Sequence, residues 1–322
     1  MWLFVALLAY VILAVVGIMD KIILAKSVPK PIVFVFYSTV FVIPLFFFLP
    51  FGVSLPNIWT DHLIFAISGI CFALALWAMF IGFQKSEISH VGPLVGAAVP
   101  FFVLLLSYIF LHEKLTATNL TAIFVLIMGS LLISFETSRR HNGWHRGMAW
   151  GVLAGLLFGI SHVASKYAYD SYGFYNGFIW TKLWIGVFGG FLLFSPSVRA
   201  IFVKNTKVFS SLTQESKQVS SPLVRLENKN LLDEQIGRPV LIFTNKFLGV
   251  IGVVLIQYAM ALGSVSLVNA LAGVQYGLLV ILVAIISKFW PNIIKETYSK
   301  KEIVQETVAV LIIGFGLFLL IK

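Results

Sequence analysis

Lys182 is the residue of this sequence whose type and position suggest chemistry most directly. It lies well inside the apolar run 174–195. A charge at the centre of a bilayer costs about 3 kcal/mol or more, so an ionisable residue there is a functional candidate by default. Lys182 could bind an anionic group of a substrate, or its long side chain could extend to the nearer membrane interface. Both interpretations stay open.

Two more lysines and a histidine lie near the ends of apolar runs. Lys21 and Lys166 occupy matching positions in two stretches that align at an offset of 145 residues. They could approach one cavity, or each could anchor a helix end, with Asp20 pairing locally beside Lys21. His162 lies one helical turn before Lys166 and shares its face. It most simply packs in the interior, although imidazole exchanges protons near neutral pH.

Uncharged polar residues form a stripe in the run 264–289. One helical face of this run carries Ser266, Asn269, Gly273 and Tyr276. That face must contact protein or a wet cavity rather than lipid, so it either forms hydrogen bonds between helices or lines a cavity. Four further polar residues in apolar runs are weaker candidates for the same two roles: Gln257, Tyr258, Tyr37 and Ser38.

Glycines spaced four residues apart predict close helix packing. Such pairs occur twice, as Gly92 with Gly96 and as Gly273 with Gly277. Small residues at this spacing let two helix backbones approach each other. We therefore expect these four glycines to lie at helix contacts.

The sequence contains no group of residues typical of a catalytic or metal site. His141 and His145 have i, i+4 spacing but lie in a polar connection without suitably placed acids, and Cys71 is the sole cysteine. No ATP-binding loop or cofactor fingerprint occurs. We therefore expect no catalytic site, no metal and no cofactor.

The amino-acid composition indicates that most of the surface of this protein faces lipid. Hydrophobic residues make up 59% and charged residues 11%, whereas a soluble domain is about a quarter charged. A span needs about 20 apolar residues, so 322 residues accommodate about ten. The net charge of +10 comes from basic residues that lie mostly between apolar runs, where they orient spans, which argues against nucleic acid as a partner.

Ten apolar runs can be delimited, and we expect an all-α integral membrane protein of about ten transmembrane helices. They cover 2–25, 32–51, 63–83, 88–111 and 118–135, then 147–168, 174–195, 246–262, 264–289 and 303–321. The stretch at about 196–245 is rich in Lys, Arg, Ser, Glu and Asn. It predicts a polar extramembrane loop inserted in the second half.

The second half of the chain repeats the first in order. The first and sixth runs align at an offset of 145 residues, the fourth and ninth at 177, and the fifth and tenth at 185. These alignments predict five-helix repeats at 1–138 and 147–322. Because a unit with five spans ends on the opposite side from its start, its repeat must be inverted, as in many secondary transporters.

One segment is typical of a known family. It runs from Ser86-Glu87-Ile88-Ser89-His90-Val91-Gly92-Pro93 through Val99-Pro100 to Phe110-Leu111-His112-Glu113-Lys114-Leu115 and Gly129, with a counterpart from Ala261 to Ala270. The chain thereby resembles the EamA-like branch of the drug/metabolite transporter superfamily. The resemblance implies two tandem five-helix domains and transport, with substrates that range from amino acids to lipids.

We expect a secondary transporter that moves a small anionic or zwitterionic metabolite by alternating access, because the buried charges are mainly lysines. A lipid flippase or a non-transporting membrane scaffold is the alternative. The partners would be the bilayer, in particular the plasma (inner) membrane, and a small-molecule substrate; the oligomeric state stays open. Of 23 basic residues, 19 lie in odd-numbered connections, which places both termini outside, whereas the resemblance implies cytoplasmic termini.

Overall fold

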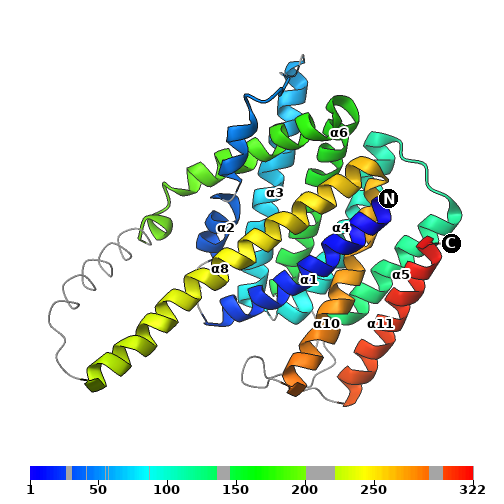
Figure 1. The fold of residues 1–322 in the computed structure, drawn as a ribbon. Helices are drawn as coiled ribbons and strands as arrows, with labels where there is room; N and C mark the ends of the chain where they lie inside the picture. Colours follow the sequence, from blue (N-terminus) through cyan, green and yellow to red (C-terminus); the bar gives the residue numbers. More distant parts are fainter. Residues whose placement is uncertain are drawn as a thin grey trace.

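The computed structural model describes residues 1–26, 31–40, 42–54, 56, 58–86, 88–135, 146–200, 222–289 and 300–321. Within these ranges the fold is helical (Figure 1). The first half contains α1 (Trp2–Lys26), α2 (Pro31–Val40), η1 (Ile43–Phe48), α3 (Trp59–Lys85), α4 (Ile88–Leu106), η2 (Ser107–Leu111) and α5 (Ala117–Ser134). The second contains α6 (Arg146–Leu192), α8 (Pro222–Leu262), α9 (Val265–Ala270), α10 (Ala272–Phe289) and α11 (Lys300–Ile321).

Among the described residues, eight helices are long and apolar enough to cross a membrane. The longest, α6, has 47 residues and a break at Gly173, whose φ of 73° leaves the helical region. The 47 residues correspond to about 70 Å of helix, more than twice the hydrocarbon thickness of about 30 Å. α6 is therefore long enough to contain both the sixth and the seventh expected spans. The expected second span is instead the ten-residue α2 followed by η1. Ten spans therefore stay a prediction, while a multi-pass membrane protein is established.

The second half of the expected polar loop is helical. The sequence predicts a connection at about 196–245, whereas α8 begins at Pro222 and its apolar span begins at Val240. Charged residues such as Arg225 and Glu227 are good helix formers, so polarity does not prevent a helix here. Residues 201–221 of the expected loop lie outside the described residues.

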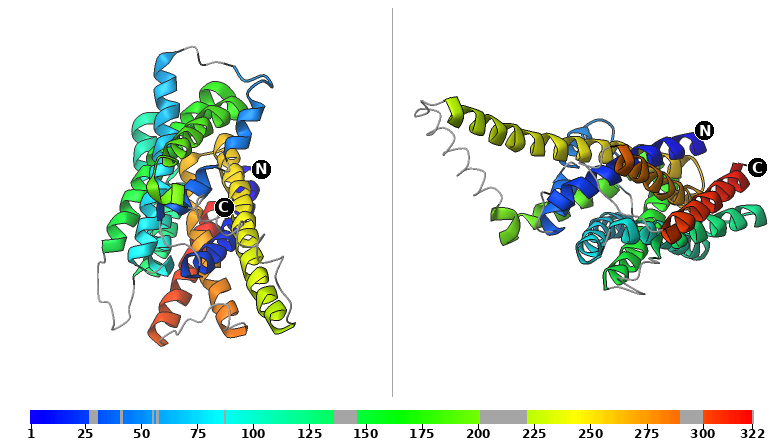
Figure 2. Two further views of the ribbon diagram at one scale, coloured as in Figure 1. Left: turned by 90° about the vertical axis from the view of Figure 1, so that its left-hand side faces the viewer. Right: turned by 90° about the horizontal axis from the view of Figure 1, so that it is seen from below.

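Helices of the two halves pack against each other throughout (Figures 1 and 2). α1 runs along α8, α3 along α6, and α5 along α11. α4 lies at the centre and contacts α5, α6, α9 and α10. The two chain ends lie near each other in all three views.

The four glycines expected at helix contacts lie against neighbouring helices. Gly92 and Gly96 of α4 face the ring of Tyr276 in α10, and a Cβ on Gly96 would overlap that ring. A Cβ on Gly273 would come within 2.8 Å of the Ser130 Oγ in α5. Gly277 has an ordinary contact, at 3.4 Å, with Ile313 of α11.

Candidate functional site

The side chain of Lys182 is buried in the second part of α6, with 3% of its surface exposed. Its Nζ lies 4.9 Å from the ring centroid of Phe72 and 5.4 Å from that of Phe178. Aromatic faces attract a cation, but they do not neutralise it. Among the described residues the structure records no hydrogen bond or ion pair for this ammonium group. Lys182 is thus a buried cation suited to receive an anion.

His162 and Asn269 form a buried polar pair between α6 and α9. The Nδ1 of His162 lies 2.6 Å from the Oδ1 of Asn269. Because an amide oxygen only accepts, Nδ1 is the donor. Asn269 in turn donates to the carbonyl oxygen of Val265 at 2.8 Å and to the Sδ of Met260 at 3.3 Å. These bonds fix the orientation of the imidazole ring.

Phe72 links this pair to Lys182. Its ring centroid lies 6.5 Å from that of His162 and 5.3 Å from that of Phe158, and Phe158 lies 5.9 Å from His162. The ring of Phe72 therefore contacts the lysine and the histidine, and both polar groups belong to one cluster. We call Lys182, Phe72, His162 and Asn269 the central cluster.

Gln257 and Tyr258 of α8 adjoin the central cluster through aromatic rings. The Tyr169 hydroxyl donates to the Gln257 Oε1 at 2.5 Å. The Phe174 ring lies 5.0 Å from that of Tyr258 and 5.2 Å from that of Phe178, which also contacts Lys182. The Gln257 Nε2 is buried and has no hydrogen-bond partner among the described residues. This donor is a second group suited to an anionic oxygen.

The remaining predicted site residues lie elsewhere. Lys166 pairs with Asp170 one turn along α6 at 2.9 Å. The Ser38 hydroxyl donates to the Phe34 carbonyl within α2 at 2.9 Å, and Tyr37 is half-buried. Tyr276 packs on the α4 glycines, and the side chain of Lys21 lies outside the described part of the chain.

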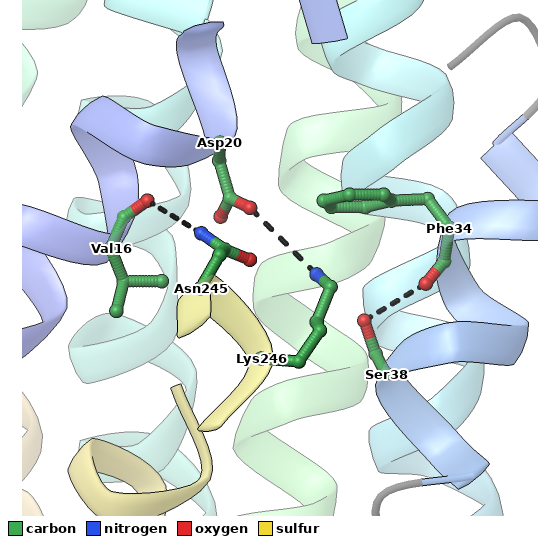
Figure 3. Close-up of polar contacts among 6 residues, drawn as sticks. All are labelled: Val16, Asp20, Phe34, Ser38, Asn245 and Lys246. Carbon is green, nitrogen blue, oxygen red and sulfur yellow. Dashed lines mark hydrogen bonds and ion pairs between the residues drawn. The ribbon is translucent and has the colours of Figure 1, made fainter. Parts of the chain in front are cut away.

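Asp20 forms an ion pair that sequence reasoning did not identify (Figure 3). Its partner is Lys246 of α8 at 3.8 Å. Lys246 is 7% exposed and is the first residue of the expected apolar run 246–262. The apolar residues from Val240 onward, which precede it, are the signal that places Lys246 inside a span. Beside the pair, the Asn245 amide donates to the Val16 carbonyl at 3.2 Å.

Asp61 is a second buried carboxylate that the sequence did not single out. It is 3% exposed and lies in the first turn of α3. The Tyr167 hydroxyl donates to it at 3.0 Å, and the Tyr172 hydroxyl donates to its other oxygen. These bonds tie α3 to α6 just before the break at Gly173.

One contact between the two halves of the chain recurs with the roles of the halves exchanged. The Asn245 amide of α8 donates to the Val16 carbonyl of α1, and the Ser68 hydroxyl of α3 donates to the Ser161 carbonyl of α6 at 3.1 Å. Asn245 and Ser68 are 177 residues apart, and Val16 and Ser161 are 145 residues apart. These are the offsets at which the sequence repeats itself.

The family comparison matches the first half of this architecture. The model of the EamA-like transporter family matches residues 1–135. These residues are less than half of the chain, and over them the sequence is similar to EamA-like transporters. The resemblance to the EamA-like branch of the drug/metabolite transporter superfamily is thereby confirmed over these residues.

A structural similarity covers nearly the whole chain. A crystal structure of a protein has a TM-score of 0.60 to this chain at 15% sequence identity, over 98% of this chain and 93% of that one. At this identity the similarity concerns the fold alone. No curated protein matches the sequence. The chain is thus an integral, multi-pass membrane protein whose first 135 residues match the EamA-like transporter family.

Proposed function

We propose that this chain is a secondary transporter that moves a small anionic or zwitterionic metabolite by alternating access. The observation that carries the proposal is the buried ammonium group of Lys182, which has aromatic neighbours and no anionic partner among the described residues. A buried unpaired charge is costly, and an anionic substrate would remove that cost by supplying the partner.

Neighbouring donors favour the same substrate class. The Gln257 Nε2 is buried without a hydrogen-bond partner among the described atoms, and an anionic oxygen would satisfy it. Phe72 and Phe178 lie against the Lys182 ammonium group, and Phe174 packs on Phe178. They offer an apolar wall to the rest of a metabolite, so the site combines charge selection with apolar packing.

The pattern of helix contacts supports an inverted repeat. In the predicted repeat, α1 corresponds to the first part of α6, α3 to α8, and α4 to α10. The α1–α8 contact then corresponds to the α3–α6 contact, and the α1–α10 contact corresponds to the α4–α6 contact. The hydrogen bonds of Asn245 and Ser68 follow the same exchange. In such folds the substrate lies near the bilayer midplane where the repeats meet, and the central cluster joins elements of both halves.

Reconstituted protein tests the proposal. Purified protein would first be screened for thermal stabilisation by carboxylates, phosphates and amino acids, because a ligand that binds the folded state raises its melting temperature. Uptake of the stabilising solute into sealed proteoliposomes would then be compared for wild type, Lys182→Met and Lys166→Met. We expect Lys182→Met to abolish uptake and Lys166→Met, which removes a locally paired lysine, to retain it.

Wild-type uptake by Lys182→Met would overturn the assignment of the site. Stabilisation by cationic solutes alone would overturn the substrate class. If the protein bound no solute and moved none, while lipid probes remained in their leaflets, a non-transporting scaffold would be the better description.

Lipid translocation is a second candidate, favoured by one observation. An apolar groove of about 700 Å³ lies between α10 and α11, and its wall includes Val280, Ile281, Ile285, Val310 and Leu311. Lys288 and Glu306 also line it. Scrambling of a fluorescent phospholipid in the same proteoliposomes, with no uptake of soluble anions, would favour this function.

A further inference from the structure

The Asp20–Lys246 ion pair joins four helices of the two halves. Asp20 belongs to α1 and Lys246 to α8, and the two charged atoms are 3.8 Å apart. The Lys246 Nζ also lies 3.4 Å from the ring centroid of Phe34 in α2 and 5.6 Å from that of Phe80 in α3. In Figure 3 the lysine reaches from α8 between the carboxylate and the Phe34 ring. One side chain thus connects α8 to three helices of the first half.

An uncharged contact occupies the equivalent place on α3 and α6. The Ser68 and Ser165 hydroxyls are 2.7 Å apart. Ser165 lies 145 residues after Asp20, and Ser68 lies 177 residues before Asn245. Ser165 is thus the repeat equivalent of Asp20, and Ser68 that of Asn245, whereas Lys246 corresponds to Gly69 at the same offset. The equivalent place on α3 and α6 therefore has a hydroxyl contact where α1 and α8 have an ion pair.

The two contacts occupy corresponding positions along their helices. Asp20 is near the end of α1, and Ser165 is near the end of the part of α6 that precedes the Gly173 break. Lys246 is near the start of the apolar part of α8, and Ser68 is in the first half of α3. In an inverted repeat, the charged contact thus closes one mouth of the path and the hydroxyl contact the other.

We propose that Asp20 and Lys246 form an electrostatic latch that holds the α1–α8 mouth closed, while the hydroxyl contact at the α3–α6 mouth is the weaker of the two. This inference rests on the alternating access of the proposed function. Separating two opposite charges in an apolar interior leaves both unpaired, whereas separating two hydroxyls breaks one neutral hydrogen bond. The latch therefore opposes opening of the α1–α8 mouth in the empty protein.

Matched cysteine reporters test the latch. In a Cys71→Ala background, Val16→Cys reports on the α1–α8 contact and Ser161→Cys on its equivalent, because the carbonyls of Val16 and Ser161 accept the two equivalent hydrogen bonds. Labelling by an impermeant maleimide would be timed in leaky membranes, where the reagent reaches both faces. Asp20→Asn should speed labelling of Val16→Cys about tenfold, a population shift of about 1.4 kcal/mol, and leave Ser161→Cys unchanged.

Two further variants complete the test. Ser68→Ala should increase the labelling rate of Ser161→Cys. This increase should be smaller than the increase that Asp20→Asn causes in the labelling rate of Val16→Cys. The double exchange Asp20→Lys with Lys246→Asp should restore slow labelling of Val16→Cys. Three results would each overturn the latch. The labelling rates could be unchanged in Asp20→Asn, they could increase equally at both reporters, or the double exchange could fail to restore slow labelling of Val16→Cys.

This measurement is separate from the test of transport. Labelling requires neither a substrate nor a gradient, so a wrong substrate assignment leaves the labelling pattern intact. If uptake by wild type were demonstrated but labelling did not respond to Asp20→Asn, the latch would fail and the transporter proposal would stand.

Discussion

The His162 Nδ1 and the Asn269 Oδ1 are 2.6 Å apart, although 107 residues separate them in the chain. This bond connects α6 to the short helix α9 in a buried setting. It sets the orientation of a ring that packs against Phe72, the same residue that contacts Lys182. The bond therefore positions one side of the central cluster.

Removing the Asn269 amide should weaken both stability and transport. Asn269→Leu leaves the His162 Nδ1 donor buried without its acceptor, at a cost of about 1–3 kcal/mol. Thermal unfolding in detergent would measure the stability and proteoliposome uptake the activity. Thr121→Ala is the control, because its exposed hydroxyl bonds only the preceding turn of its own helix. A melting temperature for Asn269→Leu equal to the control would contradict the prediction.

Gln257 should contribute to substrate affinity. Gln257→Leu removes the buried Nε2 donor and also leaves the Tyr169 hydroxyl without its acceptor. Loss of one hydrogen bond to a charged group costs about 1.5–3 kcal/mol, so KM should rise by at least about tenfold. Tyr258→Phe retains the ring that contacts Phe174 and should keep the wild-type KM. Similar KM values for both variants would count against Gln257.

The contact between Gly96 and Tyr276 should tolerate no side chain at Gly96. In Gly96→Ala the new Cβ would overlap the Tyr276 ring, and such overpacking costs about 1–3 kcal/mol. Gly314→Ala is the matched control, because nothing lies within 4 Å of the added Cβ, and the substitution should stabilise its helix by up to about 1 kcal/mol. Adding Tyr276→Ala to Gly96→Ala should recover part of the loss. Equal melting temperatures for the two single variants would contradict this account.

Asp61 should be a structural residue that secures the start of α3 to α6. Asp61→Leu leaves the Tyr167 and Tyr172 hydroxyls without their shared acceptor, which should destabilise the protein by about 1–3 kcal/mol. Asp170→Asn is the control, because Asp170 is 55% exposed and pairs locally with Lys166, and such a pair contributes about 1 kcal/mol or less. The prediction fails if limited proteolysis near Gly173 and the melting temperature are the same in both variants.

Helical class and membrane location follow from the sequence because they depend on local composition. Long apolar runs must be helical in lipid, where each backbone group needs an internal partner. The limit of this reasoning appears at α2, where a run expected to cover 32–51 is a ten-residue helix followed by η1. It also appears in α8, which includes residues that composition had assigned to a loop.

The sequence also singled out Lys182 as a candidate, since a lone charge inside an apolar run is conspicuous, and the structure shows its side chain to be buried. Its grouping with His162, Asn269, Gln257 and Tyr258 was not. These residues belong to α6, α8 and α9, and the phenylalanines that connect them carry no distinguishing signal in a sequence with 30 phenylalanines.

By itself, the sequence determined that this chain is a helical membrane protein with EamA-like residues over 1–135, because hydropathy and similarity are properties of the chain read in order; the internal repeat stays a prediction. The tertiary structure decided which charges meet. Asp20 is adjacent to Lys21 in the chain, yet it pairs with Lys246 on another helix. Neighbours along a helix point in different directions, so the partner of a charge depends on how helices pack, and the sequence does not state that.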